Sequence, residues 1–138
     1  MPDSYTMFPR PESIHFFEQA IQSHDKVECI QRLRDSYYEI VRKNLPTIRV
    51  FVSNYYALSL SDYFEVIEEY SDIDCLITIS KWNSVTSDAY NQGKRNSVGV
   101  FTMEEFLGAL NFGKPYKYIR PIDREDNESI WSRFTKRS

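Results

Sequence analysis

Glycine is scarce in this chain, and its scarcity argues against the common phosphate-binding loops. Only four of the 138 residues are glycine. They form neither a Gly-x-Gly-x-x-Gly fingerprint nor a P-loop, both of which need glycine so that the backbone can approach a phosphate. No Gly-x-Ser-x-Gly segment is present either, so the nucleophile elbow of the α/β-hydrolases is missing. Dinucleotide-binding enzymes, P-loop nucleotidases and elbow-type hydrolases are therefore disfavoured.

Cysteine and histidine are also rare, and neither is arranged to hold a metal. The chain has two cysteines, Cys29 and Cys75, and two histidines, His15 and His24. None of the four belongs to a recognisable metal-ligand spacing. Both histidines fit a surface or helix-end position better than a catalytic one. We therefore expect no metal ion, no cofactor and no catalytic residue.

Long hydrophobic segments are missing too. No apolar run approaches the roughly 20 residues that a membrane-spanning helix needs. The segment from Met1 to Arg10 has no apolar signal-peptide core. Two cysteines without a signal peptide are typical of the reducing cytoplasm. We expect a cytoplasmic protein that does not associate with membranes.

The chain does contain strong signals for buried β-strands. Its 41% hydrophobic and 27% charged residues are ordinary for a globular protein, and its length predicts one domain, residues 1–138. Three runs, residues 48–52, 75–79 and 98–101, are rich in β-branched and aromatic residues and nearly continuous in apolarity. Such runs are typical of strands that are buried on both faces of a parallel sheet.

Segments with helical spacing follow each of these runs. Thr102 and Glu105 form a capping box at the start of the third helix, and Asn83 or Ser84 would cap the second. A strand and helix alternation with short connections indicates right-handed crossovers. The sequence therefore predicts an α/β fold with a small parallel sheet and crossover helices across residues 47–110.

A helical segment, residues 11–44, is predicted before this core. Pro11 suits the first turn of one helix. The capping pattern Asp25-x-x-Glu28 would open a second helix that ends near Asn44. The most economical arrangement lays this longer second helix against one face of the sheet.

The charges are distributed unevenly along the chain. Residues 50–80 hold six acids and no base, whereas residues 113–138 hold seven bases and four acids. We therefore treat residues 111–138 as a basic C-terminal tail, with a short edge strand at 116–119 and a helical turn at 129–134. The tail is either a solvated segment or a contact for nucleic acid or a partner protein. A net charge of -3 and a pI near 5.4 disfavour a general nucleic-acid binder.

The best candidate site lies just after the predicted strands. Ligands of open parallel sheets bind beyond the carboxyl ends of the strands, and polar or aromatic side chains occur there. Thr102 and Glu104 follow the third run. The residues predicted to bind a ligand or partner follow the first two runs and are Ser53, Asn54, Ser80, Lys81, Trp82 and Asn83. Helix capping by Asn83 and packing of Trp82 over the sheet edge are the structural alternatives.

Residues 75–110 resemble the latter half of Mrr-type restriction-endonuclease domains. The shared pattern is an apolar strand ending in Ser or Thr, a helix with Ala, a short strand and a Glu- and Leu-rich last helix. The residues that carry it are Ser80, Trp82, Thr86, Ala89, Val98, Val100, Phe101, Glu105, Phe106, Leu107 and Leu110. The resemblance implies a layered α/β architecture.

The resemblance does not extend to catalytic residues. In that family one strand carries Glu or Gln with Lys two residues on, and that strand would fall on residues 48–54, which have no such pair. The helix expected to end near Asn44 would replace the family's hairpin, which supplies a metal-binding Asp. A second, smaller likeness joins residues 51–54 to the opening strand of a TIR domain, without a glutamate that matches its catalytic position.

The sequence therefore predicts a non-catalytic binding or protein-interaction module with a degenerate restriction-endonuclease-like architecture. The expected partner is another protein, and the high aromatic content favours self-association as well. The alternative is an enzyme or binder that acts on a nucleotide or nucleic acid at the carboxyl ends of the strands. Loss of binding on changing Ser80, Lys81 and Asn83 would favour the alternative. Loss on changing Trp82 or the tail arginines, Arg133 and Arg137, would favour the protein partner.

Overall fold

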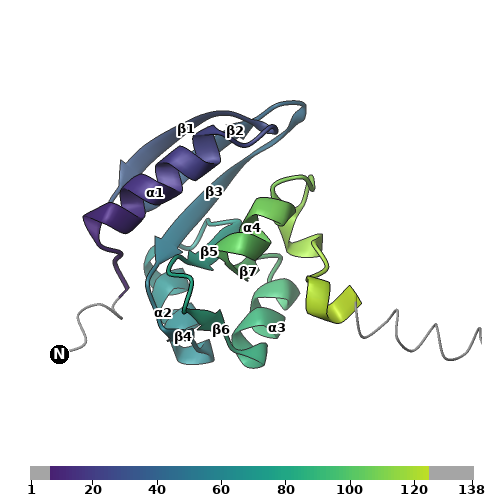
Figure 1. Ribbon diagram of the computed structural model, residues 1–138. Coiled ribbons are helices and arrows are strands. Elements are labelled where there is room, and N and C mark those ends of the chain that lie inside the picture. Colours follow the sequence, from purple (N-terminus) through teal and green to yellow (C-terminus); the bar gives the residue numbers. More distant parts are fainter. Residues whose placement is uncertain (1–6, 125–138) are drawn as a thin grey trace, which may run out of the picture.

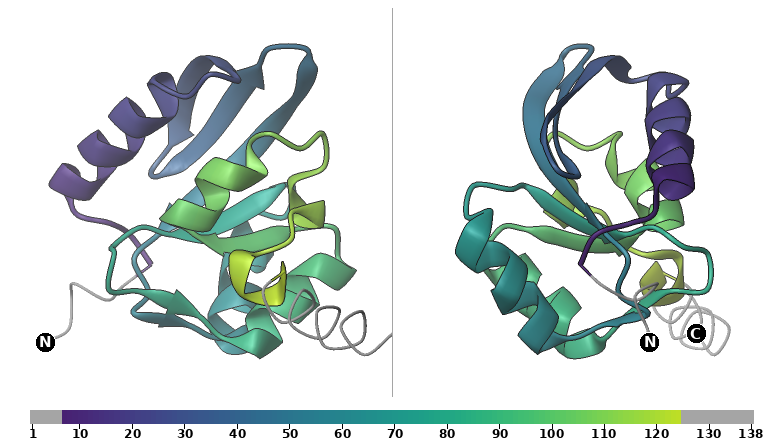
Figure 2. Two further views of the ribbon diagram at one scale, coloured as in Figure 1. Left: turned by 45° about the vertical axis from the view of Figure 1, so that its right-hand side comes forward. Right: turned by 90° about the vertical axis from the view of Figure 1, so that its left-hand side faces the viewer.

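The chain folds into a mixed five-stranded sheet between two layers of helices (Figure 1). The computed structural model describes residues 7–124. Its elements in chain order are α1 (Pro11–Gln22), β1 (Val27–Arg34), β2 (Tyr37–Arg42), β3 (Leu45–Ser53), β4 (Ala57–Leu58), α2 (Leu60–Glu69), β5 (Cys75–Thr78), β6 (Ser84–Val85), α3 (Ser87–Arg95), β7 (Gly99–Thr102), α4 (Met103–Ala109) and the 3-10 helix η2 (Pro115–Lys117). Helices α1 and α4 cover one face of the sheet, and α2 and α3 cover the other (Figure 2).

The strand order in the sheet is β1-β2-β3-β5-β7. The pairs β1–β2 and β2–β3 are antiparallel, whereas β3–β5 and β5–β7 are parallel. Strands β4 and β6 form a separate parallel pair. The α/β class and the leading helix were predicted correctly, and the three apolar runs coincide with β3, β5 and β7. The expectation of a small all-parallel sheet is wrong, because β1 and β2 add an antiparallel half.

The second helix predicted within residues 11–44 is an antiparallel hairpin. Asp35 lies in the turn between β1 and β2, and Asn44 lies in the turn between β2 and β3. Their φ values are 49° and 59°, and Asp and Asn tolerate this left-handed region better than most residues. In β2, Tyr38 and Ile40 point to the same buried face, as alternation along a strand requires. β1 is exposed along most of its length. It therefore lacks the alternating apolar pattern that would have distinguished it from a helix.

One of the predicted helix caps is present, and another is not. The capping box of Thr102 and Glu105 is present at the start of α4. Helix α3, however, is capped by Thr86, whose side-chain oxygen accepts a hydrogen bond from the amide of Ala89 at 3.2 Å. Asn83 lies before β6 and is therefore free of the capping role expected for it.

The segment after α4 also differs from its prediction. Residues 115–117 form η2 rather than an edge strand over 116–119, since Pro115 supplies a φ suited to a helical first turn. The helical turn expected at 129–134 lies outside the described residues. No helix within residues 7–124 combines the length and apolarity needed to cross a membrane.

Arg42 is a buried cation that joins the hairpin to the end of α4. Its side chain is 3% exposed, and burial lowers the pKa of its guanidinium. Its nitrogens donate to four backbone carbonyls, those of Pro46 at 2.9 Å, Leu110 at 2.9 Å, Phe112 at 2.6 Å and Gly113 at 3.0 Å. Three of these carbonyls follow the last turn of α4, where carbonyls lack partners inside the helix and a positive charge is favourable.

Replacing Arg42 should therefore destabilise the fold. We expect Arg42→Met to lower the free energy of unfolding by about 2–4 kcal/mol, because it leaves buried carbonyls without donors. Arg42→Lys should restore only part of this loss, since a single ammonium cannot reach all four carbonyls. Urea denaturation followed by circular dichroism measures the effect. Arg34→Met is the matched control, because Arg34 is half exposed in its ion pair with Glu69 and should cost about 1 kcal/mol or less.

Candidate functional site

A groove of about 860 Å³ lies at the carboxyl ends of β5 and β7, next to the first turns of α1 and α4. We call it the strand-end groove. Four of the six residues predicted to bind a ligand or partner line it, and so do Thr102 and Glu104. Those four are Ser80, Lys81, Trp82 and Asn83. The rule that ligands bind beyond the carboxyl ends of parallel strands thus led from the sequence to a real concavity.

The other two predicted residues, Ser53 and Asn54, do not line the groove. Both are buried at the end of β3. The Ser53 hydroxyl donates to the carbonyl of Ile77 at 2.8 Å. The side-chain oxygen of Asn54 accepts hydrogen bonds from the Ser80 hydroxyl at 2.8 Å and from Nδ2 of Asn83 at 2.9 Å. Ser53 and Asn54 therefore support the groove through buried hydrogen bonds and do not form part of its surface.

These contacts belong to a buried polar network that ties β3 to β5. Nδ2 of Asn83 also donates to Oγ1 of Thr78 at 2.9 Å, and that hydroxyl donates to the carbonyl of Tyr55 at 2.6 Å. Asn83, Asn54 and Thr78 are 6%, 3% and 0% exposed. We call Asn54, Thr78, Ser80 and Asn83 the polar floor. It holds residues 79–83 against the sheet and so fixes the shape of the groove.

The exposed part of the groove is aromatic. Trp82 is 75% exposed and Phe16 is 57% exposed, and both line the groove. Nζ of Lys81 lies 4.9 Å from the centroid of the Trp82 ring, within the range of a cation–π contact. Trp82 therefore does not pack over the sheet edge, which was its structural alternative. An exposed tryptophan in a concave surface is typical of a contact residue.

Phe16 and the rest of α1 were missed as part of the site. The buried face of α1 is formed by Ile14, Phe17 and Ile21, which follow helical spacing. Phe16 lies about 100° around the helix from Phe17, so it falls outside that face. A large aromatic next to a buried stripe was the available signal. The sequence could not indicate that the first turn of α1 meets the loop after β5.

The charges that line the groove are balanced. Arg10 and Lys81 are positive, while Glu12 and Glu104 are negative. A groove for a polyanion would be expected to carry an excess of positive charge. The lining charges therefore give no preference for nucleic acid.

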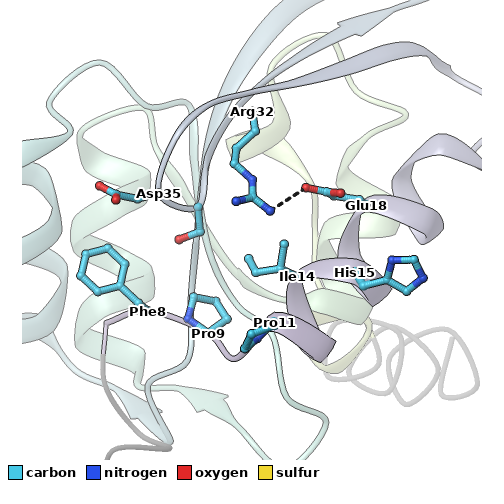
Figure 3. A pocket seen from close by; sticks show the side chains of 9 residues that line it. Phe8, Pro9, Pro11, Ile14, His15, Glu18, Arg32 and Asp35 are labelled. Atoms are coloured by element: carbon cyan, nitrogen blue, oxygen red, sulfur yellow. Dashed lines mark hydrogen bonds and ion pairs between the residues drawn. The ribbon is translucent and has the colours of Figure 1, made fainter.

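A second, smaller pocket of about 420 Å³ lies between α1 and the β1–β2 hairpin (Figure 3). Arg32 and Glu18 face each other there, with Nη2 and Oε2 at 3.2 Å (Figure 3). The Tyr38 hydroxyl donates to the same carboxylate oxygen at 2.7 Å. Burial, together with this hydrogen bond, raises the pKa of Tyr38 well above its ordinary value. The Glu18 carboxylate is thus engaged by two donors within the fold.

The acids of residues 50–80 mostly serve the fold. Asp62 forms the capping box of α2 with Ser59, and Asp74 accepts a hydrogen bond from the amide of Arg49 at 2.8 Å. Among residues 7–124, no three His, Cys, Asp or Glu side chains are grouped so that they could hold a metal ion. Strand β3 has no acid and lysine pair.

Neither histidine lines the strand-end groove. Nδ1 of His24 accepts the amide of Lys26 at 3.0 Å, and its Nε2 lies 2.9 Å from the carbonyl of Leu107. His24 therefore links the end of α1 to α4, as a helix-end histidine can. His15 lines the smaller pocket instead.

Comparisons with known proteins found neither a family model nor a curated protein that matches this chain.

The polar floor and the exposed side chains of Trp82 and Phe16, which we call the aromatic rim, should respond differently to mutation. Asn83→Ala should lower the free energy of unfolding by about 1–3 kcal/mol, because it leaves buried groups of Asn54 and Thr78 with one partner fewer. Trp82→Ala should change it by about 0.5 kcal/mol or less, since the side chain is mostly exposed. Urea denaturation of the two variants measures both effects. A Trp82 variant as unstable as the Asn83 variant would show that Trp82 supports the fold.

Proposed function

We propose that this chain is a non-catalytic protein-interaction module that binds a peptide segment of a partner protein in the strand-end groove. The observation that carries the proposal is the exposure of Trp82 and Phe16 in one concavity. Tryptophan contributes large contact area with few rotatable bonds and is enriched among the residues that dominate binding energy. The apolar residues Ile79, Met103 and Leu107 also line the groove and would pack against an inserted side chain.

The polar floor supports binding over catalysis. A catalytic acid, base or nucleophile must be within reach of a substrate and able to exchange its proton. The side chains of Asn54, Asn83 and Thr78 are buried and bonded to one another or to the backbone. They suit a rigid support for the loop that carries Trp82. A rigid loop lowers the entropy lost on binding.

A nucleotide or nucleic acid is the second candidate, favoured by the cation beside the Trp82 ring. Base stacking on an aromatic side chain flanked by Lys is a recurrent arrangement in single-strand binding. The lining charges favour the peptide, because the acids Glu12 and Glu104 offset the two lining cations and leave no excess of positive charge for a phosphate backbone.

The proposed architecture is restriction-endonuclease-like but without that family's catalytic residues. A hairpin precedes β3, which corrects the expectation that a helix replaces it and removes one difference from the Mrr-type pattern. The parallel arrangement of β3, β5 and β7 is compatible with the resemblance of residues 75–110. The missing acid and lysine pair of residues 48–54 supports a role in binding.

Selection from a displayed library of random peptides tests the proposed function. The full chain should enrich peptides with an aromatic or long aliphatic residue. Trp82→Ala should lower the affinity for the selected peptides by about tenfold or more, which corresponds to a loss of at least about 1.4 kcal/mol in binding free energy. Phe64→Ala is the matched control, because Phe64 is an exposed aromatic on α2, on the opposite side of the sheet.

Three results would contradict the proposal. The first is enrichment of no peptides. The second is equal loss of binding in the Trp82 and Phe64 variants. The third is a nucleotide or oligonucleotide that raises the melting temperature through the same groove, since a ligand that binds only the folded state stabilises it. Because Asn83→Ala disturbs the fold, Lys81→Ala is the better probe of that third outcome.

A further inference from the structure

One atom of the polar floor, Oδ1 of Asn83, accepts no hydrogen bond from any residue between 7 and 124. Asn83 lines the strand-end groove and is 6% exposed. The other end of the same amide is fully engaged, because Nδ2 donates to Asn54 and to Thr78, both at 2.9 Å. Buried polar atoms without a partner are rare in folded proteins, and each one calls for an explanation.

The neighbouring hydrogen bonds fix which end of the Asn83 amide faces the floor. The Thr78 hydroxyl gives its single hydrogen to the carbonyl of Tyr55 at 2.6 Å, so its oxygen can only accept from Asn83. The side-chain oxygen of Asn54 likewise accepts from Asn83 and from Ser80. Exchanging Oδ1 and Nδ2 of Asn83 would place oxygen against oxygen at both contacts. Oδ1 is therefore the end of the amide that is turned away from the floor, on a residue that lines the groove.

A donor from a groove ligand can reach Oδ1 after a small movement of exposed side chains. Oδ1 is itself buried, so part of the groove lining has to move aside before a donor comes within hydrogen-bond distance. Lys81 and Trp82 precede Asn83 in the same loop and are exposed, and exposed side chains exchange rotamers within nanoseconds. The bonds of Nδ2 to the floor hold the acceptor in place while these side chains adjust.

The lining of the groove favours a neutral donor over a charged one. Arg10 and Lys81 already supply two cations, and the two lining acids offset them, so no net negative charge remains to attract a third cation. Nζ of Lys81 also lies over the ring of Trp82, next to Asn83, and would repel an ammonium or guanidinium group. The main-chain N–H of a peptide is a neutral donor that must find an acceptor when it is buried. It therefore matches the buried acceptor of Asn83.

We propose that Asn83 recognises the peptide in the strand-end groove by accepting, at Oδ1, a hydrogen bond from one main-chain N–H of that peptide. This inference rests on the proposed function, because both take the groove as a peptide site. It adds a specificity-determining residue, since Trp82 and Phe16 supply contact area whereas Asn83 fixes the position of one peptide bond. A ligand without that N–H leaves the acceptor buried and unpaired, and sites built for a hydrogen bond strongly reject such ligands. Proline, which has no main-chain N–H, is therefore excluded at that position.

Single ester substitutions in a peptide selected on the full chain test this inference. Each ester replaces one main-chain N–H by oxygen and keeps the length and the side chains of the peptide. One ester should lower the affinity by about tenfold or more, as measured by isothermal titration calorimetry, and selected peptides should lack proline at that position. Equal tolerance of every ester would overturn the inference, because Oδ1 would then be satisfied by water in the complex.

A double-mutant cycle assigns the sensitive N–H to Asn83. Asn83→Ala removes the acceptor, so the loss of affinity caused by the sensitive ester should fall to about twofold or less. Thr78→Ala is the matched control, because it removes another bond of the same floor and leaves Oδ1 in place, so the loss should stay near tenfold. Both variants are titrated at a temperature where circular dichroism shows them folded. A loss that persists in the Asn83 variant, or that disappears in both variants, contradicts the assignment.

The unaltered chain provides a second measurement that does not depend on the folding of Asn83→Ala. The side-chain amide signals of Asn83 in a nitrogen–proton correlation spectrum should shift more with the parent peptide than with the sensitive ester. Esters at the other positions should reproduce the shift of the parent. Equal shifts with the parent and the sensitive ester would count against the proposed hydrogen bond.

The same experiments separate this inference from the proposed function. Selected peptides that depend on Trp82 but tolerate every ester mean that the groove binds peptides without the help of Asn83, which contradicts this inference alone. Failure to select any peptide that depends on Trp82 contradicts both. Coupling of Asn83 to a lysine or arginine side chain of the peptide, and not to a main-chain N–H, also overturns this inference while the proposed function stands.

Discussion

Burial of β3 on both faces is the constraint on which the rest of the structure depends. The strand pairs antiparallel with β2 on one side and parallel with β5 on the other. Val50 and Val52 pack under α1 and α4, while Phe51 packs under α2 and α3, and all three are fully buried. β3 lies between the two helical layers up to its end, so the polar side chains of its last residues cannot be solvated. Ser53 and Asn54 therefore bond to the end of β5, and this link places the loop that carries Trp82.

The parallel half of the sheet could be predicted from the sequence, whereas the antiparallel half could not. Strands β3, β5 and β7 are covered on both sides, so their apolar runs are nearly continuous and hard to mistake. β1 is an edge strand with most side chains in water, and its few apolar residues fit a helical period as well as a strand. Arg42 shows a further limit. Its partners at Leu110, Phe112 and Gly113 follow about 70 residues later, so no local pattern could indicate that a charged residue belongs inside.

In the candidate site, too, some features follow from the sheet topology and could be predicted, whereas others depend on packing and could not. The position of the site followed from a general rule about parallel strands. Contacts across the sheet decide whether a residue supports the site or is open to a ligand. These contacts bury Asn54 and Asn83 and leave Trp82 exposed. Phe16 joined the site because α1 covers the same face of the sheet as α4, next to the loop that follows β5. The sequence alone could not indicate that these segments lie close together in space.

The polar floor and the aromatic rim are formed by different side chains, and this affects which substitutions the surface can accept. Asn83 and Trp82 are neighbours in sequence, yet one is bonded within the fold and the other projects from it. Under the proposed function, substitutions at the rim would alter the partner while the floor keeps the loop rigid, because stability and contact area reside in different side chains. A catalytic site rarely permits this, since its reactive groups must be both held by the fold and open to the substrate. This partition is the physical reason that we propose binding, and not catalysis, for the groove.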